Sequence, residues 1–178
     1  MNGIEERLRI KQLTNEPLSV LKKFKSKNSK LNNFLERKAK HHQKEQLAYT
    51  YLLFYKNDDN ENVLVGYYTL SCSALTATEY IRSKFHHSKQ YEEYPAILIG
   101  RLAISKDYES KGFGTFILNS IKYSLCEDMR LVAGRFLVLD AVQESIDFYK
   151  KNRFEFWTSE DRNEPTRLMF FDLLQMRE

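Results

Sequence analysis

The chain is poor in cysteine, with only Cys72 and Cys126 among its 178 residues. Two cysteines are too few for the disulfide framework of a small secreted protein, and neither forms a Cys/His pair with the spacing of a metal site. The paired histidines at 41–42 and 86–87 lack the cysteines or paired carboxylates that would complete a ligand set. We therefore expect reduced thiols and no bound metal.

Long apolar runs are also absent. No stretch approaches the roughly 20 apolar residues that span a bilayer, and the N-terminus lacks the basic-then-apolar pattern of a signal sequence. These absences exclude a membrane-spanning protein and predict a soluble, cytoplasmic one with no membrane partner.

What the chain does contain suits one compact domain over residues 1–178. Apolar residues make up 42% of the sequence and aromatic residues 13%, which argues against disorder despite 29% charged residues. No repeat, low-complexity segment or linker indicates a second domain. The net charge of +4 decides little by itself.

Hydrophobic periodicity predicts alternating strands and helices along the whole chain. The expected order is β, α, β, β, α, β, α, β, α, β, β, which makes an α/β fold with a mixed sheet flanked by helices. The strands are expected at 8–13, 48–55, 63–73, 96–104, 135–141, 154–157 and 167–174, and the helices at 31–46, 78–85, 112–129 and 144–151.

The run 96–104 is too continuously apolar for a strand that is wet on one face, so it predicts a central strand buried on both faces. It leads through a polar loop to Gly112-Phe113-Gly114, where a helix is expected to begin. Free N–H groups and the positive end of a helix dipole attract anions, and glycines let a phosphate approach closely. On glycine spacing alone, a tight turn explains the pattern equally well. The chain has no Gly-x-Gly-x-x-Gly or Walker pattern, which weakens dinucleotide and nucleoside-triphosphate interpretations.

The segment ILIGRLAISKDYESKGFGTFIL, from Ile97 to Leu118, resembles the acetyl-CoA-binding motif of the GNAT superfamily of N-acetyltransferases. That loop usually reads Gln/Arg-x-x-Gly-x-Gly/Ala, and Glu109 stands at its first position here. A carboxylate is thus expected near a pyrophosphate, with weakened or adjusted binding and Lys111 as a candidate compensating charge. Segments 65–71, 100–104, 139–141 and 148–150, with the helical segment 31–39, resemble the subgroup that includes toxins acetylating aminoacyl-tRNA. Arg153 replaces the glycine that usually precedes Phe in this group, a position assigned to a turn.

The resemblance implies a single-domain GNAT-like fold with a centrally splayed, mixed β-sheet flanked by α-helices. It implies acetyl-CoA as cosubstrate, no metal, and direct acetyl transfer to a primary amine. The pantetheine arm would pair with the backbone of Leu102, Ala103 and Ile104, where an N–H is a candidate oxyanion donor. The loop residues that would bind the cofactor are Glu109, Ser110, Lys111, Gly112, Phe113, Gly114 and Thr115.

Tyr149 is the implied general acid, since a phenol with a pKa of about 10 can protonate a thiolate whose conjugate thiol has a pKa of about 8.5. The alternative is that Tyr149 is a core aromatic residue without a catalytic role. No general base is assigned, and Tyr67, Tyr68 and Glu93 are equally explained by packing or solvation. An aminoacyl α-amine, with a pKa near 8, needs little help.

The acceptor stays open. The segment Lys22–Lys44 is strongly basic, and either an RNA backbone or a solvated helix face explains it. If this segment binds RNA, the acceptor would be an aminoacyl-tRNA, and the protein would be a toxin with an antitoxin partner. The alternatives are a small amine, an antibiotic or a protein amino group as acceptor, or a non-catalytic acyl-CoA-binding module, which Glu109 and Arg153 motivate. An exposed strand edge near the C-terminus would permit a homodimer.

Overall fold

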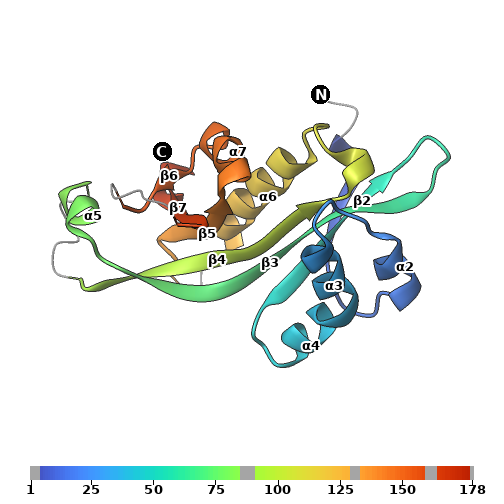
Figure 1. Ribbon diagram of the computed structural model, residues 1–178, viewed down its shortest axis with the longest axis horizontal. Coiled ribbons are helices and arrows are strands. Elements are labelled where there is room, and N and C mark those ends of the chain that lie inside the picture. The colour runs from blue at the N-terminus through green and yellow to red at the C-terminus, as the bar shows by residue number, and fades with distance from the viewer. Residues whose placement is uncertain (1–4, 85–90, 129–132, 159–163, 177–178) are drawn as a thin grey trace. The chain divides into compact units, whose positions relative to one another are not determined.

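The computed structural model describes residues 5–84, 91–128, 133–158 and 164–176 (Figure 1). Seven strands form one sheet in the order β1-β2-β3-β4-β5-β7-β6. The chain divides into two compact units: Met1–Ser71 with Gly100–Asn119, and Cys72–Ile99 with Ser120–Glu178. Strands β3 (Asn62–Thr76) and β4 (Glu93–Ile104) and helix α6 (Phe113–Asp128) each run from one unit into the other.

The first unit is built on an antiparallel sheet. Strand β1 (Leu8–Gln12) pairs with β2 (Tyr49–Lys56), and β2 pairs with β3, with a register shift between Leu53 and Phe54. The side chain of Asn57 accepts a 2.8 Å hydrogen bond from the N–H of Glu61, which closes the β2–β3 turn. Strands β2 and β3 confirm the two strands predicted at 48–55 and 63–73 and pair as a hairpin.

Helices α2 (Leu18–Lys23), α3 (Ser29–Arg37) and α4 (Ala39–Lys44) also belong to the first unit. The prediction of one helix over 31–46 is wrong, because Lys38, at φ −116°, ends α3 and begins α4. The break allows Phe34, Leu35 and Ala39 all to join one buried cluster with strand residues. Helix α2 was not predicted. Pro17 precedes it at φ −60°, a conformation that suits a helix start.

The second unit combines parallel and antiparallel pairing. The N-terminal part of β4 runs parallel to β5 (Phe136–Val142), which pairs antiparallel with β7 (Thr166–Asp172), and β7 pairs with β6 (Glu155–Phe156). The aromatic rings of Tyr94, Phe136, Trp157 and Phe170 meet edge to face in its core. This arrangement confirms the predicted mixed sheet.

The pairing of β4 with β5 covers Ala96–Leu98 only, among the residues that the structure describes. From Ile99 onward β4 therefore has no ladder with β5 in the described chain, as a centrally splayed sheet requires. Helices α5 (Glu79–Lys84) and α7 (Ile146–Lys151) lie close to their predicted ranges. Residue 85, residue 129 and the histidines at 86–87 lie outside the described residues.

Predicted strand boundaries differ from the structure at β3, β4 and β7. Strand β3 ends at Thr76 rather than at residue 73. Strand β4 begins at Glu93, three residues before its predicted start at residue 96. Strand β7 ends at Asp172 rather than at residue 174, because Leu173–Met176 forms a 3-10 turn whose Leu174 N–H donates to the Asp172 carboxylate at 3.1 Å. Of the helices described, none has the length and apolar character needed to cross a bilayer.

Candidate functional site

The loop between β4 and α6 is anchored at its start and open at its end. The N–H of Ser105 donates to the Val65 carbonyl at 2.8 Å, and a 3-10 turn over Lys106–Tyr108 follows. Gly112 has φ +84°, and a Cβ added there would meet nothing within 4 Å. Helix α6 begins at Phe113, as predicted. Gly112 thus allows the chain to adopt a positive φ before the helix, and it leaves the helix N-terminus open to a ligand.

Aromatic packing holds this loop in the first unit. Phe113 is buried, and its ring lies 6.0 Å from that of Tyr108 and 5.4 Å from that of Tyr55. Ser110, Lys111 and Gly112 are exposed. The packed side of the loop therefore fixes its position while the N–H-rich side faces solvent.

Glu109 has a charge partner that the sequence did not suggest. Its carboxylate lies 2.5 Å from Lys27 Nζ, whereas Lys111 Nζ lies 4.8 Å from the centre of the Tyr108 ring. Lys27 comes from the segment between α2 and α3, far from the loop along the chain. No local pattern in the sequence could have indicated this pair.

The strand segment Leu102–Ile104 belongs to the same unit as the loop. Strand β3 approaches it closely, since a Cβ on Gly66 would lie 2.9 Å from Ile104 Cδ1 and 3.2 Å from the Ala103 carbonyl oxygen. The structure therefore places all ten residues predicted to bind the cofactor within one compact unit: Leu102, Ala103, Ile104, Glu109, Ser110, Lys111, Gly112, Phe113, Gly114 and Thr115.

Tyr149 belongs to the second unit, on α7. Its ring contacts Phe148 and Phe154 at centroid distances of 5.1 and 5.7 Å, and 9% of the residue is exposed. Burial raises the pKa of its phenol to about 12. The phenol is thus neutral at any physiological pH.

Arg153 shows why a glycine is common at its position. It adopts φ +67°, and its N–H donates to the Lys150 carbonyl at 2.9 Å where the chain turns out of α7. This left-handed conformation is one that glycine takes without strain. The prediction that the position serves a turn is confirmed.

Of the tyrosines left unassigned, Tyr67 is a packing residue. It is buried, its hydroxyl donates to the Leu31 carbonyl at 2.8 Å, and burial raises its pKa. A phenol with a raised pKa and a committed proton is poorly suited to act as a base. Tyr68 stacks on Tyr51 with ring centroids 5.0 Å apart.

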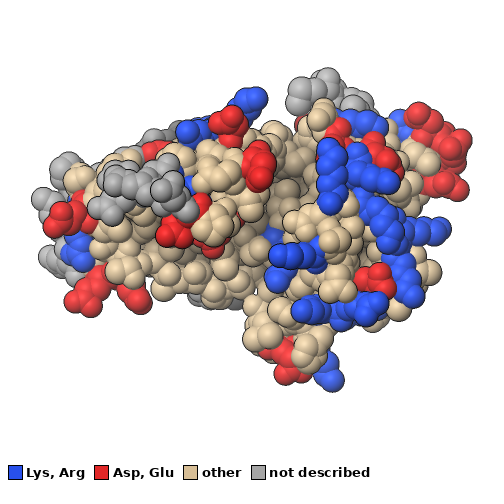
Figure 2. Space-filling model, viewed as in Figure 1, with Lys and Arg blue, Asp and Glu red and all other residues tan. Residues whose placement is uncertain are grey.

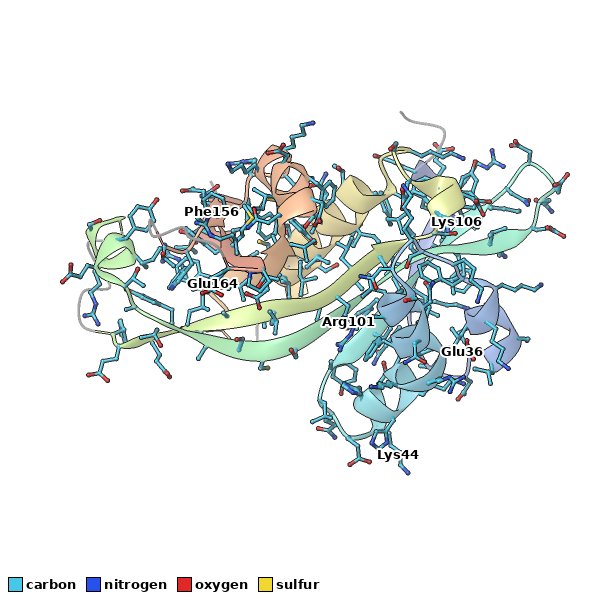
Figure 3. The ribbon with its side chains drawn as sticks, viewed as in Figure 1. Glu36, Lys44, Arg101, Lys106, Phe156 and Glu164 are labelled. Atoms are coloured by element: carbon cyan, nitrogen blue, oxygen red, sulfur yellow. The ribbon has the colours of Figure 1, made fainter. Side chains whose placement is uncertain are left out.

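Basic side chains gather over α2, α3 and α4, where Figure 2 shows a broad blue surface. The basic residues of this cationic face are all exposed: Lys22, Lys23, Lys25, Lys27, Lys30, Arg37, Lys38, Lys40 and Lys44. Arg101 reaches from β4 towards α3 and stacks on Phe34, with Cζ 3.6 Å from the ring centre (Figure 3). Within Lys22–Lys44 the only acidic residue is Glu36, so this part of the first unit presents a dense positive surface.

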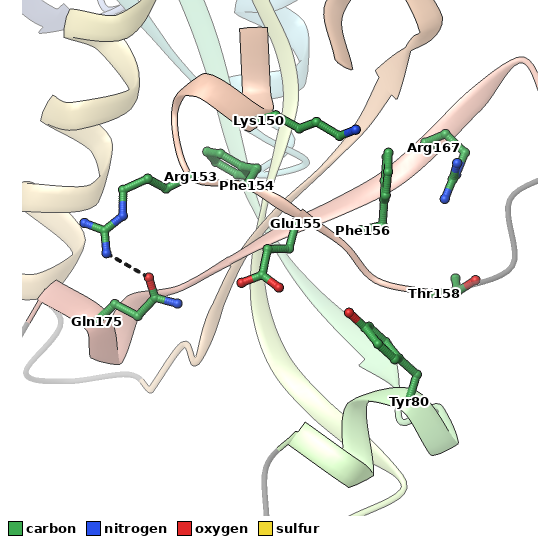
Figure 4. A pocket seen from close by; sticks show the side chains of 9 residues that line it. All are labelled: Tyr80, Lys150, Arg153, Phe154, Glu155, Phe156, Thr158, Arg167 and Gln175. Atoms are coloured by element: carbon green, nitrogen blue, oxygen red, sulfur yellow. Dashed lines mark hydrogen bonds between the residues drawn. The ribbon is translucent and has the colours of Figure 1, made fainter. Parts of the chain in front are cut away.

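A cavity of about 640 Å³ lies within the second unit (Figure 4). Its walls include Phe156, with Arg167 Cζ and Lys150 Nζ 3.9 and 4.8 Å from the ring centre. Arg153 donates to Gln175 across one side at 3.1 Å. The sequence did not predict it, because its residues come from α5, α7, β6, β7 and the C-terminal turn. No cluster of metal-ligating side chains occurs among the described residues.

No protein-family model matches the chain, and no curated protein matches it by sequence. Solved structures do match. The tyrosine-to-phenylalanine mutant of KacT has a TM-score of 0.78 at 22% identity, covering 96% of this chain and 98% of that one. AtaT complexed with acetyl-methionyl-tRNAfMet has a TM-score of 0.77 at 22% identity, over 96% and 97% of the two chains.

A third match is a tyrosine-to-phenylalanine mutant of the AtaT toxin bound to acetyl-CoA and to the C-terminus of the antitoxin AtaR. Its TM-score is 0.75 at 21% identity, and the match covers 96% of each chain. These likenesses extend over nearly the whole length of both partners. The chain therefore has the GNAT-like fold predicted from its motifs, in the form found in the AtaT and KacT toxin structures.

Proposed function

We propose that this chain is an acetyl-CoA-dependent N-acetyltransferase that transfers an acetyl group directly to the α-amine of an aminoacyl-tRNA. The observation that carries the proposal is the unit formed by Leu102–Ile104 and the loop Glu109–Thr115. It joins a strand segment without a β5 partner in the described chain to an open helix N-terminus. A strand edge and an anion site in this order suit the pantetheine arm and the pyrophosphate of acetyl-CoA.

The cofactor assignment is supported by the fold. A structure of this fold, that of the AtaT mutant with its antitoxin, contains acetyl-CoA. In this chain, backbone N–H groups of Ser110 to Thr115 would bind the pyrophosphate, and the backbone of Leu102 to Ile104 would bind the pantetheine. No metal takes part in the proposal.

The reaction needs an amine nucleophile, a stabilised oxyanion and a protonated leaving thiolate. A backbone N–H of β4 would stabilise the oxyanion, and Tyr149 would donate the proton to sulfur. Matching structures of both AtaT and KacT are tyrosine-to-phenylalanine mutants, which fits a functional tyrosine in this fold. An aminoacyl amine attacks without a dedicated base.

The acceptor is proposed from the cationic face together with the AtaT complex with acetyl-methionyl-tRNAfMet. Exposed lysines and arginines on α2, α3 and α4 suit the phosphates of an RNA backbone. An aminoacyl-tRNA substrate implies a cytoplasmic enzyme. An antitoxin partner is proposed as well, because AtaT is bound to its antitoxin AtaR.

Residues 1–178 are proposed to act as one GNAT domain, since β3, β4 and α6 are shared by both compact units. A homodimer also stays a prediction. The two-residue strand β6 lies at one end of the sheet order and would be the exposed edge.

The test is incubation of the protein with acetyl-CoA, charged total tRNA and a panel of free amines, with products identified by mass spectrometry. Acetylation of the aminoacyl group on tRNA is expected. Reaction with free amines alone would favour the small-amine alternative. Failure to bind acetyl-CoA at millimolar concentration, measured by calorimetry, would exclude both enzymatic functions.

A further inference from the structure

The pair Lys27–Glu109 connects the cationic face to the candidate phosphate loop within the first unit. Lys27 is held in place by its neighbours. The Lys25 carbonyl accepts hydrogen bonds from the N–H of Lys106 at 2.8 Å and from the hydroxyl of Ser105 at 3.3 Å. The segment that carries Lys27 is thereby hydrogen-bonded to the start of the loop through the Lys25 main-chain carbonyl.

Hydrogen bonds also hold this segment on the side that leads into α3. The Asn32 side chain accepts from the N–H and the hydroxyl of Ser26, both at 2.8 Å, and donates back to the Ser26 carbonyl at 3.0 Å. Asn28 caps α3 through a 2.9 Å hydrogen bond from the Lys30 N–H. Lys27 therefore projects from a turn whose backbone is fixed on both sides.

Charge balance gives this position a role. Glu109 by itself would repel a pyrophosphate at the start of α6, and Lys27 Nζ lies 2.5 Å from its carboxylate. An ammonium group has three N–H donors, and this contact uses one. The Lys27 side chain is 76% exposed and that of Glu109 is 33% exposed. The remaining donors of Lys27 thus face solvent beside Glu109.

We propose that Lys27 is a phosphate-binding residue of the acetyl-CoA site, which holds Glu109 with one N–H and a pyrophosphate oxygen with another. The proposal rests on the proposed function. In place of the usual Gln or Arg of the GNAT loop motif, the segment between α2 and α3 supplies a cation. Glu109 positions that cation. The alternative is that Lys27 and Glu109 form an ordinary exposed ion pair, which would contribute little to stability or to ligand binding. Only a phosphate-binding Lys27 would affect the binding of a ligand with a pyrophosphate more than that of a ligand without one.

The experiment compares Lys27→Met, Glu109→Gln and the double variant in the full chain. Affinity for acetyl-CoA is measured by calorimetry, and affinity for S-acetylpantetheine, which has the same thioester arm without the pyrophosphate, by NMR titration. Lys56→Met is the matched control, because Lys56 is an exposed lysine of the first unit outside the cationic face. Thermal unfolding verifies that every variant is folded.

Lys27→Met is expected to weaken acetyl-CoA binding about tenfold, the effect of losing one charge-assisted hydrogen bond. Binding of S-acetylpantetheine should not change, and Lys56→Met should resemble the unaltered chain. Lys27→Met should cost less affinity in the Glu109→Gln background, where no carboxylate is exposed by the loss of its partner.

Unchanged acetyl-CoA affinity in Lys27→Met, or equal losses for both ligands, would overturn this inference and leave the proposed function intact. No acetyl-CoA binding by the unaltered chain would overturn both.

Discussion

Tyr149 and Lys122 are the buried ionisable residues of the second unit whose pKa values are shifted furthest. Burial raises the pKa of Tyr149 to about 12 and lowers that of Lys122 to about 8. In each case the neutral form is favoured, because burial removes the solvation of a charge. The consequences differ: Tyr149 stays protonated near neutral pH, whereas Lys122 makes the stability of the fold depend on pH.

Tyr149→Phe is expected to lower kcat for acetyl transfer by about a hundredfold while leaving acetyl-CoA affinity unchanged, because it removes only the proton donor. Steady-state kinetics and calorimetry measure the two quantities. Tyr123→Phe is the control, since Tyr123 is 64% exposed. An unchanged kcat in Tyr149→Phe would remove this residue from the mechanism.

Lys122 is expected to make the protein more stable as pH rises from about 7.5 to 9.5. Its Nζ donates to the Asn152 carbonyl at 2.6 Å, beside the Phe171 ring, and burial followed by the charge of Arg153 lowers its pKa. The unfolded chain, with an ordinary lysine pKa, binds more protons in this interval. The free energy of unfolding should therefore rise by about 2 kcal/mol.

Urea unfolding at the two pH values measures this change. Lys122→Met removes the titrating group, so its stability should change less over the interval than that of the unaltered chain. Equal pH dependence in both proteins would show that Lys122 is not responsible.

At the scale of elements, two glycines of the first unit should respond differently to the same substitution. Gly66→Ala would place a Cβ 2.9 Å from Ile104 Cδ1 and 3.2 Å from the Ala103 carbonyl, which overpacks β3 against β4. Gly112→Ala meets open space but must hold φ +84°. We expect losses of about 2 kcal/mol for the first, from overpacking, and about 1 kcal/mol for the second, from backbone strain.

Chemical denaturation measures both losses. Gly112→Ala should also weaken acetyl-CoA binding, because the loop that it strains is the one proposed to present N–H groups to the pyrophosphate. A larger stability loss for Gly112→Ala than for Gly66→Ala would contradict the close approach of β3 and β4.

Strands and the loop were predictable from sequence because their signals are local. Continuous apolar residues specify β4, and glycine near a helix start specifies the turn before α6. The break at Lys38 and helix α2 were not predictable in this way. Lys38 is an ordinary helix-forming residue, and only the burial of Ala39 beside Phe34 and Leu35 explains the bend. The Lys27–Glu109 pair depends on folding alone, since its members are far apart in the chain.

At the scale of the whole molecule, the uneven charge is the clearest feature. The net charge is only +4, yet exposed cations concentrate on α2, α3 and α4. A polyanion would respond to this local density rather than to the total. Nucleic-acid binding should therefore depend steeply on salt and on which cations are removed.

Replacing Arg37 and Lys44 with alanine is expected to weaken tRNA binding and to reduce the slope of log affinity against log salt by about 1 to 2, because fewer counterions are released. Filter binding across a salt series measures the slope. The control is Lys56→Ala with Lys151→Ala, two exposed cations outside the cationic face. Equal effects of the two double variants would exclude this face as the RNA site.

The contact between Lys27 and Glu109 also suggests how homologous sequences can be recognised. If Glu109 functions only with a cation from the α2–α3 segment, the two positions should change together during evolution. Relatives with an acidic residue at the start of the loop should then carry Lys or Arg at the position of Lys27, and relatives with Gln or Arg in the loop should not need it. A search for this two-part signature would find homologues that the loop pattern alone passes over.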